Sequence, residues 1–272
     1  MARASERHEV TRKRVLYDRP GTGQVVIRYG VEYGPTDVGA RMDLYFPSGW
    51  SEGMSAPAVL FISGLSDIGA MGVLGCRINE MESFVSWARL VAASGLIGIT
   101  YTTGVDPAAD TLHVIRHLQA SGAGLGIDTT RLGLWAGSSH VPNALGLLME
   151  QPRSFRCAVL CYGFMLDLDG STDMADAQRL WRFANPSAGK TVDDLPVDVP
   201  LFIVRAGQDT NPHLNESIDR FISHALRRNL PVAFVNHREG PHAFELEDDS
   251  DATRAIVRDI LAFFESRLRA GK

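Results

Sequence analysis

Three residue types that together perform nucleophilic catalysis follow separate buried strands, in the order Ser138, Asp209 and His242. A serine hydroxyl needs a base to take its proton, and a histidine in that role needs a carboxylate to fix its tautomer. Asp209 alone is typical of a helix cap, and His242 alone of a solvated loop histidine. Because all three side chains occur in a known catalytic order, we expect Ser138 to be a nucleophile, His242 its base and Asp209 the orienting acid.

The segment "LGLWAGSSHVPNALGLLM" (132–149) predicts a strand that turns tightly into a helix. In the pattern G-x-S-x-G, such a turn holds a serine hydroxyl clear of the sheet. The two glycine positions around Ser138 hold Ala136 and His140, so the match is imperfect. Ser138 is preferred to Ser139 because it fits the strand register. The alternative is that the two serines only cap the following helix.

Two backbone N–H groups are candidates for an oxyanion hole, the pair of donors that stabilises negative charge on the reacting oxygen. One is the N–H of Ser139, at the start of the predicted helix. The other is the N–H of Leu65, because Ser63-Gly64-Leu65 follows the early buried run "VLFIS". Gly64 would allow the backbone to approach this site closely.

The elements that must position these residues are strands and helices in alternation. Polar and apolar residues alternate over 24–34 and 40–47, which predicts half-exposed antiparallel strands. Continuous apolar runs predict strands buried on both faces of a parallel sheet, at 56–63, 95–101, 131–137, 157–163, 200–207 and 231–237. Amphipathic helices are predicted around 84–91, 108–115 and 256–268. The fold class is therefore α/β, with a mostly parallel central sheet, antiparallel N-terminal strands and helices on both faces.

We expect one domain over 1–272, with a flexible, solvated N-terminal arm at 1–20. The segment 164–199 is longer than a simple crossover needs, and it predicts a small cap with a helix near 173–184. An ordinary surface excursion is the alternative. If the segment is a cap, Phe164, Met165 and Trp181 would line a substrate pocket together with Gly64.

Composition excludes several classes of function. The formal net charge is -5 and both signs are interspersed, so the sequence shows no basic surface that would bind nucleic acid or an anionic membrane. No apolar run is long enough to span a membrane. The 3 cysteines are an odd number, which favours reduced thiols in the cytoplasm. No histidine or carboxylate cluster at metal-ligand spacing accompanies them, so no metal site is expected. The oligomeric state stays open, with a homodimer as one option.

At these residues the sequence resembles the α/β-hydrolase superfamily, in particular its dienelactone-hydrolase-like and esterase-like branch. The resemblance covers roughly residues 40–268 and includes "ARMDLYFPSG", "FISGLSD", "GIDTTRLGLWAGSS", "VRAGQDTNPHLNESIDRF" and "EGPHAFELEDD". It implies the corresponding fold, hydrolysis of small esters or lactones through an acyl-enzyme, and no cofactor. Dienelactone hydrolases typically carry a cysteine nucleophile. None of the cysteines here stands at the predicted turn, so a serine enzyme is implied.

Two other functions remain open from the sequence. The first is a peptidase or amidase of the prolyl-oligopeptidase-like type, although those proteins usually carry a further large domain. The second is a non-catalytic protein that binds a small molecule on a hydrolase scaffold, which the imperfect pattern around Ser138 motivates.

Overall fold

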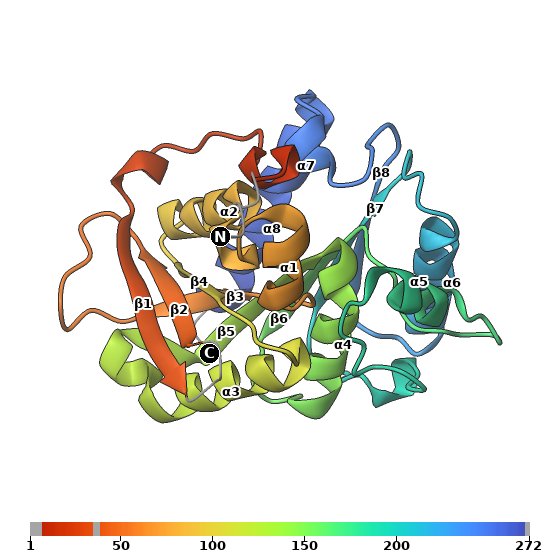
Figure 1. Cartoon of the computed structure of the whole chain (residues 1–272), viewed down its shortest axis with the longest axis horizontal. Helices are drawn as coiled ribbons and strands as arrows, with labels where there is room; N and C mark the ends of the chain where they lie inside the picture. The colour runs from red at the N-terminus through yellow and green to blue at the C-terminus, as the bar shows by residue number, and fades with distance from the viewer. Residues whose placement is uncertain (1–6, 35–38, 270–272) are drawn as a thin grey trace, which may run out of the picture.

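The computed structural model describes residues 7–34 and 39–269. Its centre is an eight-stranded sheet in the order β1-β2-β4-β3-β5-β6-β7-β8, which crosses the molecule from left to right in Figure 1. The strands are β1 (Val26–Gly34), β2 (Ala40–Phe46), β3 (Ala56–Phe61), β4 (Ile97–Tyr101), β5 (Ile127–Gly137), β6 (Cys157–Cys161), β7 (Leu201–Ala206) and β8 (Val232–His237). The β1/β2 and β2/β4 pairs are antiparallel and the other pairs are parallel. The predicted fold class is confirmed.

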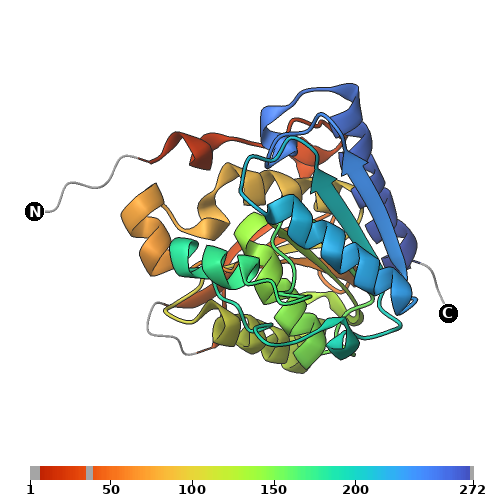
Figure 2. The same cartoon turned by 90° about the vertical axis from the view of Figure 1, so that its right-hand side faces the viewer.

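Helices cover both faces of this sheet, as the turned view in Figure 2 shows. One apolar cluster joins α2 (Glu82–Ala93) and α8 (Asp251–Arg269) to one face. A second cluster joins α3 (Pro107–Ser121), α4 (Val141–Glu150) and α6 (Leu214–Arg227) to the other. Neighbouring residues of β5 divide between the two clusters, since Leu134 belongs to one and Trp135 to the other. This alternation explains why the strand reads as a continuous apolar run.

The remaining elements are short. They comprise α1 (Asp67–Leu74), α5 (Asp173–Trp181), α7 (Phe244–Glu247) and the 3-10 turns η1 (Glu9–Arg12), η2 (Thr22–Gln24), η3 (Ile78–Glu80), η4 (Gly122–Leu125), η5 (Ser138–His140) and η6 (Val192–Asp194). Within the described ranges, none of the helices combines the length and the apolar character needed to cross a bilayer.

The last strand, β8, differs from the prediction that it is buried on both faces. Its residues are exposed or half-buried except for His237, and Phe234 is 42% exposed. The reason is its place in the sheet, because β8 lies at the edge and has a neighbouring strand on one side only. A continuous apolar run does not distinguish an edge strand from a central one.

The N-terminal segment also differs from the expected solvated arm. Residues 1–6 of that prediction lie outside the described residues, but 7–20 pack against the body of the protein. Val15 is buried in the cluster that contains α2 and α8. The Leu16 N–H donates to the Glu245 carbonyl at 2.7 Å. Basic residues of the segment pair with acids of the body, through Arg7–Glu80, Lys13–Glu247 and Arg19–Glu265.

The segment 164–199 contains α5 and η6, joined by loops. The predicted helix near 173–184 ends at Trp181, because Arg182 takes the left-handed conformation with φ 55°. Met174, Ala177 and Phe183 form a small apolar cluster that contacts Leu65 and Phe164. This packing places the segment beside the loop after β3.

Candidate active site

The turn between β5 and α4 holds Ser138 in a backbone conformation that side chains rarely adopt. Its φ is 55°, in the left-handed region, and the short turn η5 leads from it into α4. A non-glycine residue in this region costs about 1–3 kcal/mol and persists only where its surroundings fix it. The strained residue is Ser138, at the carboxyl end of a central parallel strand, where reactive groups gather in this class of sheet.

Ser138, His242 and Asp209 form one chain of hydrogen bonds. Ser138 Oγ lies 2.8 Å from His242 Nε2, and His242 Nδ1 lies 2.6 Å from Asp209 Oδ2. Both contacts are satisfied when the Ser138 hydroxyl donates to Nε2 and the Nδ1–H donates to the carboxylate. The structure therefore brings together three residues that are predicted from the ends of β5, β7 and β8.

The carboxyl group of Asp209 is held in its ionised form. Burial raises its pKa, but the hydrogen bond and charge of His242 and two bonds from Asn211 outweigh burial and leave the pKa below its ordinary value. Asn211 N and Nδ2 donate to Asp209 Oδ1 at 2.9 and 2.8 Å. Asn211 is a residue that sequence reasoning missed, although an Asp-x-Asn after a buried strand is a signal for such a turn.

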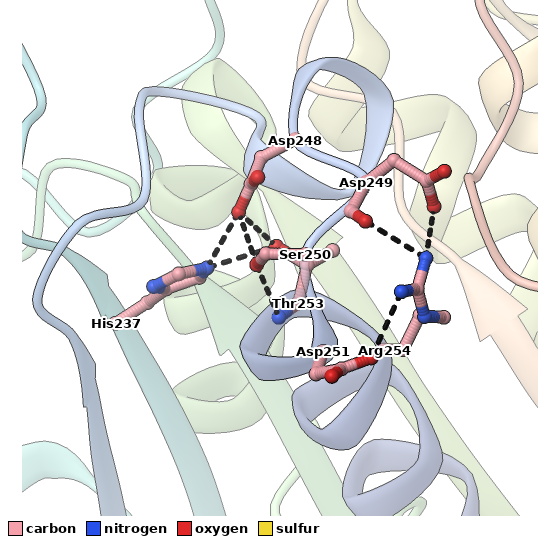
Figure 3. Close-up of polar contacts among 7 residues, drawn as sticks. All are labelled: His237, Asp248, Asp249, Ser250, Asp251, Thr253 and Arg254. Atoms are coloured by element: carbon pink, nitrogen blue, oxygen red, sulfur yellow. Dashed lines mark hydrogen bonds and ion pairs between the residues drawn. The ribbon is translucent and has the colours of Figure 1, made fainter.

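The loop that carries His242 is held by hydrogen bonds between the end of β8, before the loop, and the residues that follow it. At the end of β8, His237 Nε2 lies 3.1 Å from Asp248 Oδ2 and 2.8 Å from Thr253 Oγ1, as Figure 3 shows. Thr253 also donates to Asp248 Oδ2 at 2.6 Å. Gly240 passes so close to His237 that a Cβ on it would lie 2.6 Å from the ring. Nothing in the sequence links these residues in advance.

A buried acid, Glu245, is linked to the His242 ring through Tyr162. The Tyr162 ring meets the His242 ring edge-on, with centroids 5.2 Å apart, and its hydroxyl donates to Glu245 Oε1. Trp87 Nε1 donates to the same oxygen at 3.2 Å. Burial raises the pKa of Glu245, and these two hydrogen bonds offset only part of that effect. The environment therefore favours the neutral acid behind the histidine.

The loop after β3 passes directly against the turn that carries Ser138. A Cβ on Gly64 would lie 2.5 Å from the Ser139 carbonyl oxygen, so only glycine fits there. The Gly64 carbonyl accepts from the Ala184 N–H at 2.7 Å. Because the peptide is trans, the Leu65 N–H points the opposite way from that carbonyl. Leu65 and Ser139 both line the cavity beside Ser138. Two oxyanion donors would have to lie at this position.

A cavity of about 860 Å³ opens beside Ser138 and His242. Its walls are largely apolar and come from α1, α5 and the loops after β3, β4 and β6, with lining side chains that include Ile68, Val73, Val105, Leu180 and Phe183. Of the predicted pocket residues, Phe164 and Trp181 line it. Met165 instead lies fully buried in the core and Gly64 packs against the turn, so neither belongs to the cavity lining.

Comparison with solved structures places this architecture among known folds. A bacterial heroin esterase aligns over 94% of this chain and 88% of its own, with TM-score 0.65 and 14% identity. A thermostable esterase from Pseudomonas putida aligns over 93% and 86%, with TM-score 0.67 and 12% identity. Esterase B from Lactobacillus rhamnosis aligns over 93% and 89%, with TM-score 0.65 and 16% identity. The chain has the α/β-hydrolase fold. By sequence, no family model and no curated protein matches it.

The α/β-hydrolase fold usually carries glycines around its nucleophile because the turn is crowded. Here the glycines stand on the neighbouring loops. A Cβ on Gly163 would lie 2.5 Å from the Ser138 carbonyl oxygen, and Gly64 fits against Ser139 and His140 in the same way. Because Gly163 and Gly64 lack side chains, the neighbouring loops leave room for the turn. This room explains how a histidine fits at position 140.

Proposed function

We propose that this protein is a serine hydrolase that cleaves a small carboxylic ester or lactone through an acyl-enzyme. The observation that carries the proposal is the continuous hydrogen-bonded chain from Ser138 through His242 to Asp209. The solved esterases that share its fold support an ester as the substrate. The dienelactone-hydrolase-like branch, the single domain, the cap at 164–199, the cytoplasmic location and a homodimer stay predictions.

In the first half of the proposed reaction, His242 Nε2 takes the Ser138 proton as Oγ bonds to the acyl carbon. The Leu65 and Ser139 N–H groups donate to the resulting oxyanion, while ionised Asp209 stabilises the imidazolium. The imidazolium then gives its proton to the leaving alkoxide, the C–O bond breaks and the alcohol departs. In the second half, His242 takes a proton from water, the hydroxide attacks the acyl carbon, and the acid leaves as Ser138 regains its proton.

The proposal is tested by labelling the protein with a fluorophosphonate and mapping the modified residue by mass spectrometry. The wild type, Ser138→Ala and Ser139→Ala are labelled in parallel. We expect the label on Ser138 and none in Ser138→Ala. A label on Ser139 would reassign the nucleophile, and no labelled serine would overturn the proposal in favour of a non-catalytic binding protein.

Turnover separates an esterase from an amidase. The same acyl group is offered as a p-nitrophenyl ester and as a p-nitroanilide. We expect hydrolysis of the ester, and a loss of roughly 10⁴- to 10⁶-fold in kcat for Ser138→Ala. Faster cleavage of the anilide would point to a peptidase or amidase instead. Equal ester rates for the wild type and Ser138→Ala would refute Ser138 as the nucleophile.

A further inference from the structure

The residue two positions after Ser138 is a buried histidine that the proposed reaction does not use. His140 ends η5, and it is 8% exposed. Its ring meets the ring of Phe84 edge-on, with centroids 5.2 Å apart and an interplanar angle of 88°. This position holds glycine in the usual pattern around the nucleophile, so the side chain is an addition that this chain makes to its fold.

The His140 ring is bonded to the loop that carries one of the proposed oxyanion donors. The Gly64 N–H donates to His140 Nδ1 at 2.8 Å in a buried contact. On the other side of the same residue, the Gly64 carbonyl accepts from Ala184 N at 2.7 Å. The next carbonyl, of Leu65, accepts from Thr103 Oγ1 at 2.7 Å. Polar contacts therefore hold the backbone on both sides of the Leu65 N–H.

The bond from Gly64 requires a neutral imidazole. An N–H group only donates, so Nδ1 must offer its lone pair and the ring proton must reside on Nε2. Burial lowers the pKa of His140 to about 4, which keeps this acceptor available at neutral pH. The same ring could not serve as an acceptor at Nδ1 if it were doubly protonated.

We propose that His140 is a positioning residue, which holds the Gly64 N–H through Nδ1 and thereby fixes Gly64 so that the N–H of the next residue, Leu65, is aimed at the reacting oxygen. The inference rests on the proposed function, because it gives the oxyanion donor its orientation. His140 belongs to the turn that carries Ser138, and it accepts a hydrogen bond from the loop that carries Leu65. One side chain thereby sets the position of the donor relative to the nucleophile.

The experiment compares esters with thionoesters, in which sulfur replaces the carbonyl oxygen. Sulfur is a weak acceptor, so a well-aimed N–H favours the oxoester, and this preference measures how well the donor is placed. His140→Phe keeps the ring but loses the acceptor, and His140→Ala removes the acceptor without adding bulk. His140→Asn retains an acceptor oxygen near the position of Nδ1. Ser138→Ala controls for the proposed function, and thermal unfolding reports the folded state of each variant.

For His140→Phe and His140→Ala, we expect kcat on the oxoester to fall by about 10- to 100-fold with KM nearly unchanged, and the preference for the oxoester to shrink. His140→Asn should restore most of both. Equal losses on both substrates, or an unchanged preference in the acceptor-free variants, would overturn the role of His140 while leaving the hydrolase proposal intact. If Ser138→Ala retains full activity, the hydrolase proposal itself fails. If His140→Phe does not fold, His140→Ala decides the question by the same criteria.

Discussion

Gly64 approaches Ser139 so closely that a Cβ on Gly64 would lie 2.5 Å from the Ser139 carbonyl oxygen. The two proposed oxyanion donors belong to Ser139 itself and to Leu65, the residue after Gly64. The closeness of the two loops therefore determines how far apart the donors stand. In the proposed reaction, donors held in this way would need no rearrangement when charge develops on the substrate, which is how an oxyanion hole lowers the barrier.

Gly64→Ala tests this contact. Because the atoms in the way are backbone, we expect the loops to separate, with about 1–3 kcal/mol lost from the free energy of unfolding. The ester kcat should fall as the donors separate. Urea unfolding and ester kinetics measure the two effects.

Gly72→Ala is the matched control, since a Cβ at this exposed position of α1 meets nothing within 4 Å. It should stabilise the helix by about 0.5–1 kcal/mol. Equal effects of the two substitutions would contradict the role of the contact.

Asp209→Asn should leave the fold intact and remove most activity. Without the carboxylate, the imidazole loses both its tautomer control and the charge that balances it, and kcat should fall on the order of 10⁴-fold. Circular dichroism and ester kinetics check the two parts. A variant within tenfold of the wild type would exclude Asp209 from the proposed mechanism.

The buried acid behind the histidine predicts a pH dependence of stability. The pKa of Glu245 is raised by burial, so above the ordinary pKa of 4.5 the unfolded chain releases a proton that the folded protein keeps. Stability is then lost as pH rises from there through the folded pKa. Glu245→Gln cannot ionise, and its amide oxygen can still accept from Tyr162 and Trp87. We expect its stability relative to the wild type to increase between pH 4 and pH 7 in urea unfolding. A difference that stays constant with pH would mean that the pKa of Glu245 is the same in the folded and the unfolded protein.

Thr253→Val tests the anchor of the loop that carries His242. The hydroxyl of this fully buried residue contacts both His237 and Asp248. Its removal leaves polar groups with fewer partners, and we expect a loss of about 1–3 kcal/mol in the free energy of unfolding. Thr130→Val removes an exposed hydroxyl that bonds to Asp128 and should change stability by about 0.5 kcal/mol or less. Comparable losses from both variants would mean that the buried network adds nothing.

The cavity wall predicts a dependence on the size of the substrate. Trp181 lines the cavity and is 59% exposed. In Trp181→Ala we expect kcat/KM for long-chain p-nitrophenyl esters to fall by about tenfold relative to the acetate, since about 1.4 kcal/mol of apolar contact corresponds to that factor. Leu226→Ala, at an exposed apolar residue outside the cavity lining, should leave the ratio unchanged. An unchanged ratio in Trp181→Ala would place the acyl chain elsewhere.

Much of the fold could be predicted from sequence because the strands are alternating or continuous apolar runs and the segments between them have helical spacing. All eight predicted runs contain strands of the central sheet. The position of β8 at the edge could not be predicted, because side-chain composition does not reveal which strands are neighbours. The packing of residues 7–20 was missed for a related reason. The acids that neutralise this basic segment are distant in sequence.

The residues proposed to react are easier to locate from sequence than the residues that surround them. Ser138, Asp209 and His242 each follow a strand, so local patterns locate them. His140, Glu245 and His237 are instead marked by contacts with residues that are distant in sequence or on another loop. At position 140 the sequence shows only a missing glycine, and the close approach of Gly64 to His140 becomes evident only when both loops are seen together.

Residues 7–20 are hydrogen-bonded to the elements that lie behind His242. Val15 donates its N–H to Ser86 Oγ and Leu16 donates to the Glu245 carbonyl, so this strap spans α2 and α7. A shortened protein beginning at β1 would retain every proposed reactive group but would uncover the wall behind His242. Removal of residues 7–20 should therefore expose apolar and polar groups that this segment covers in the full chain.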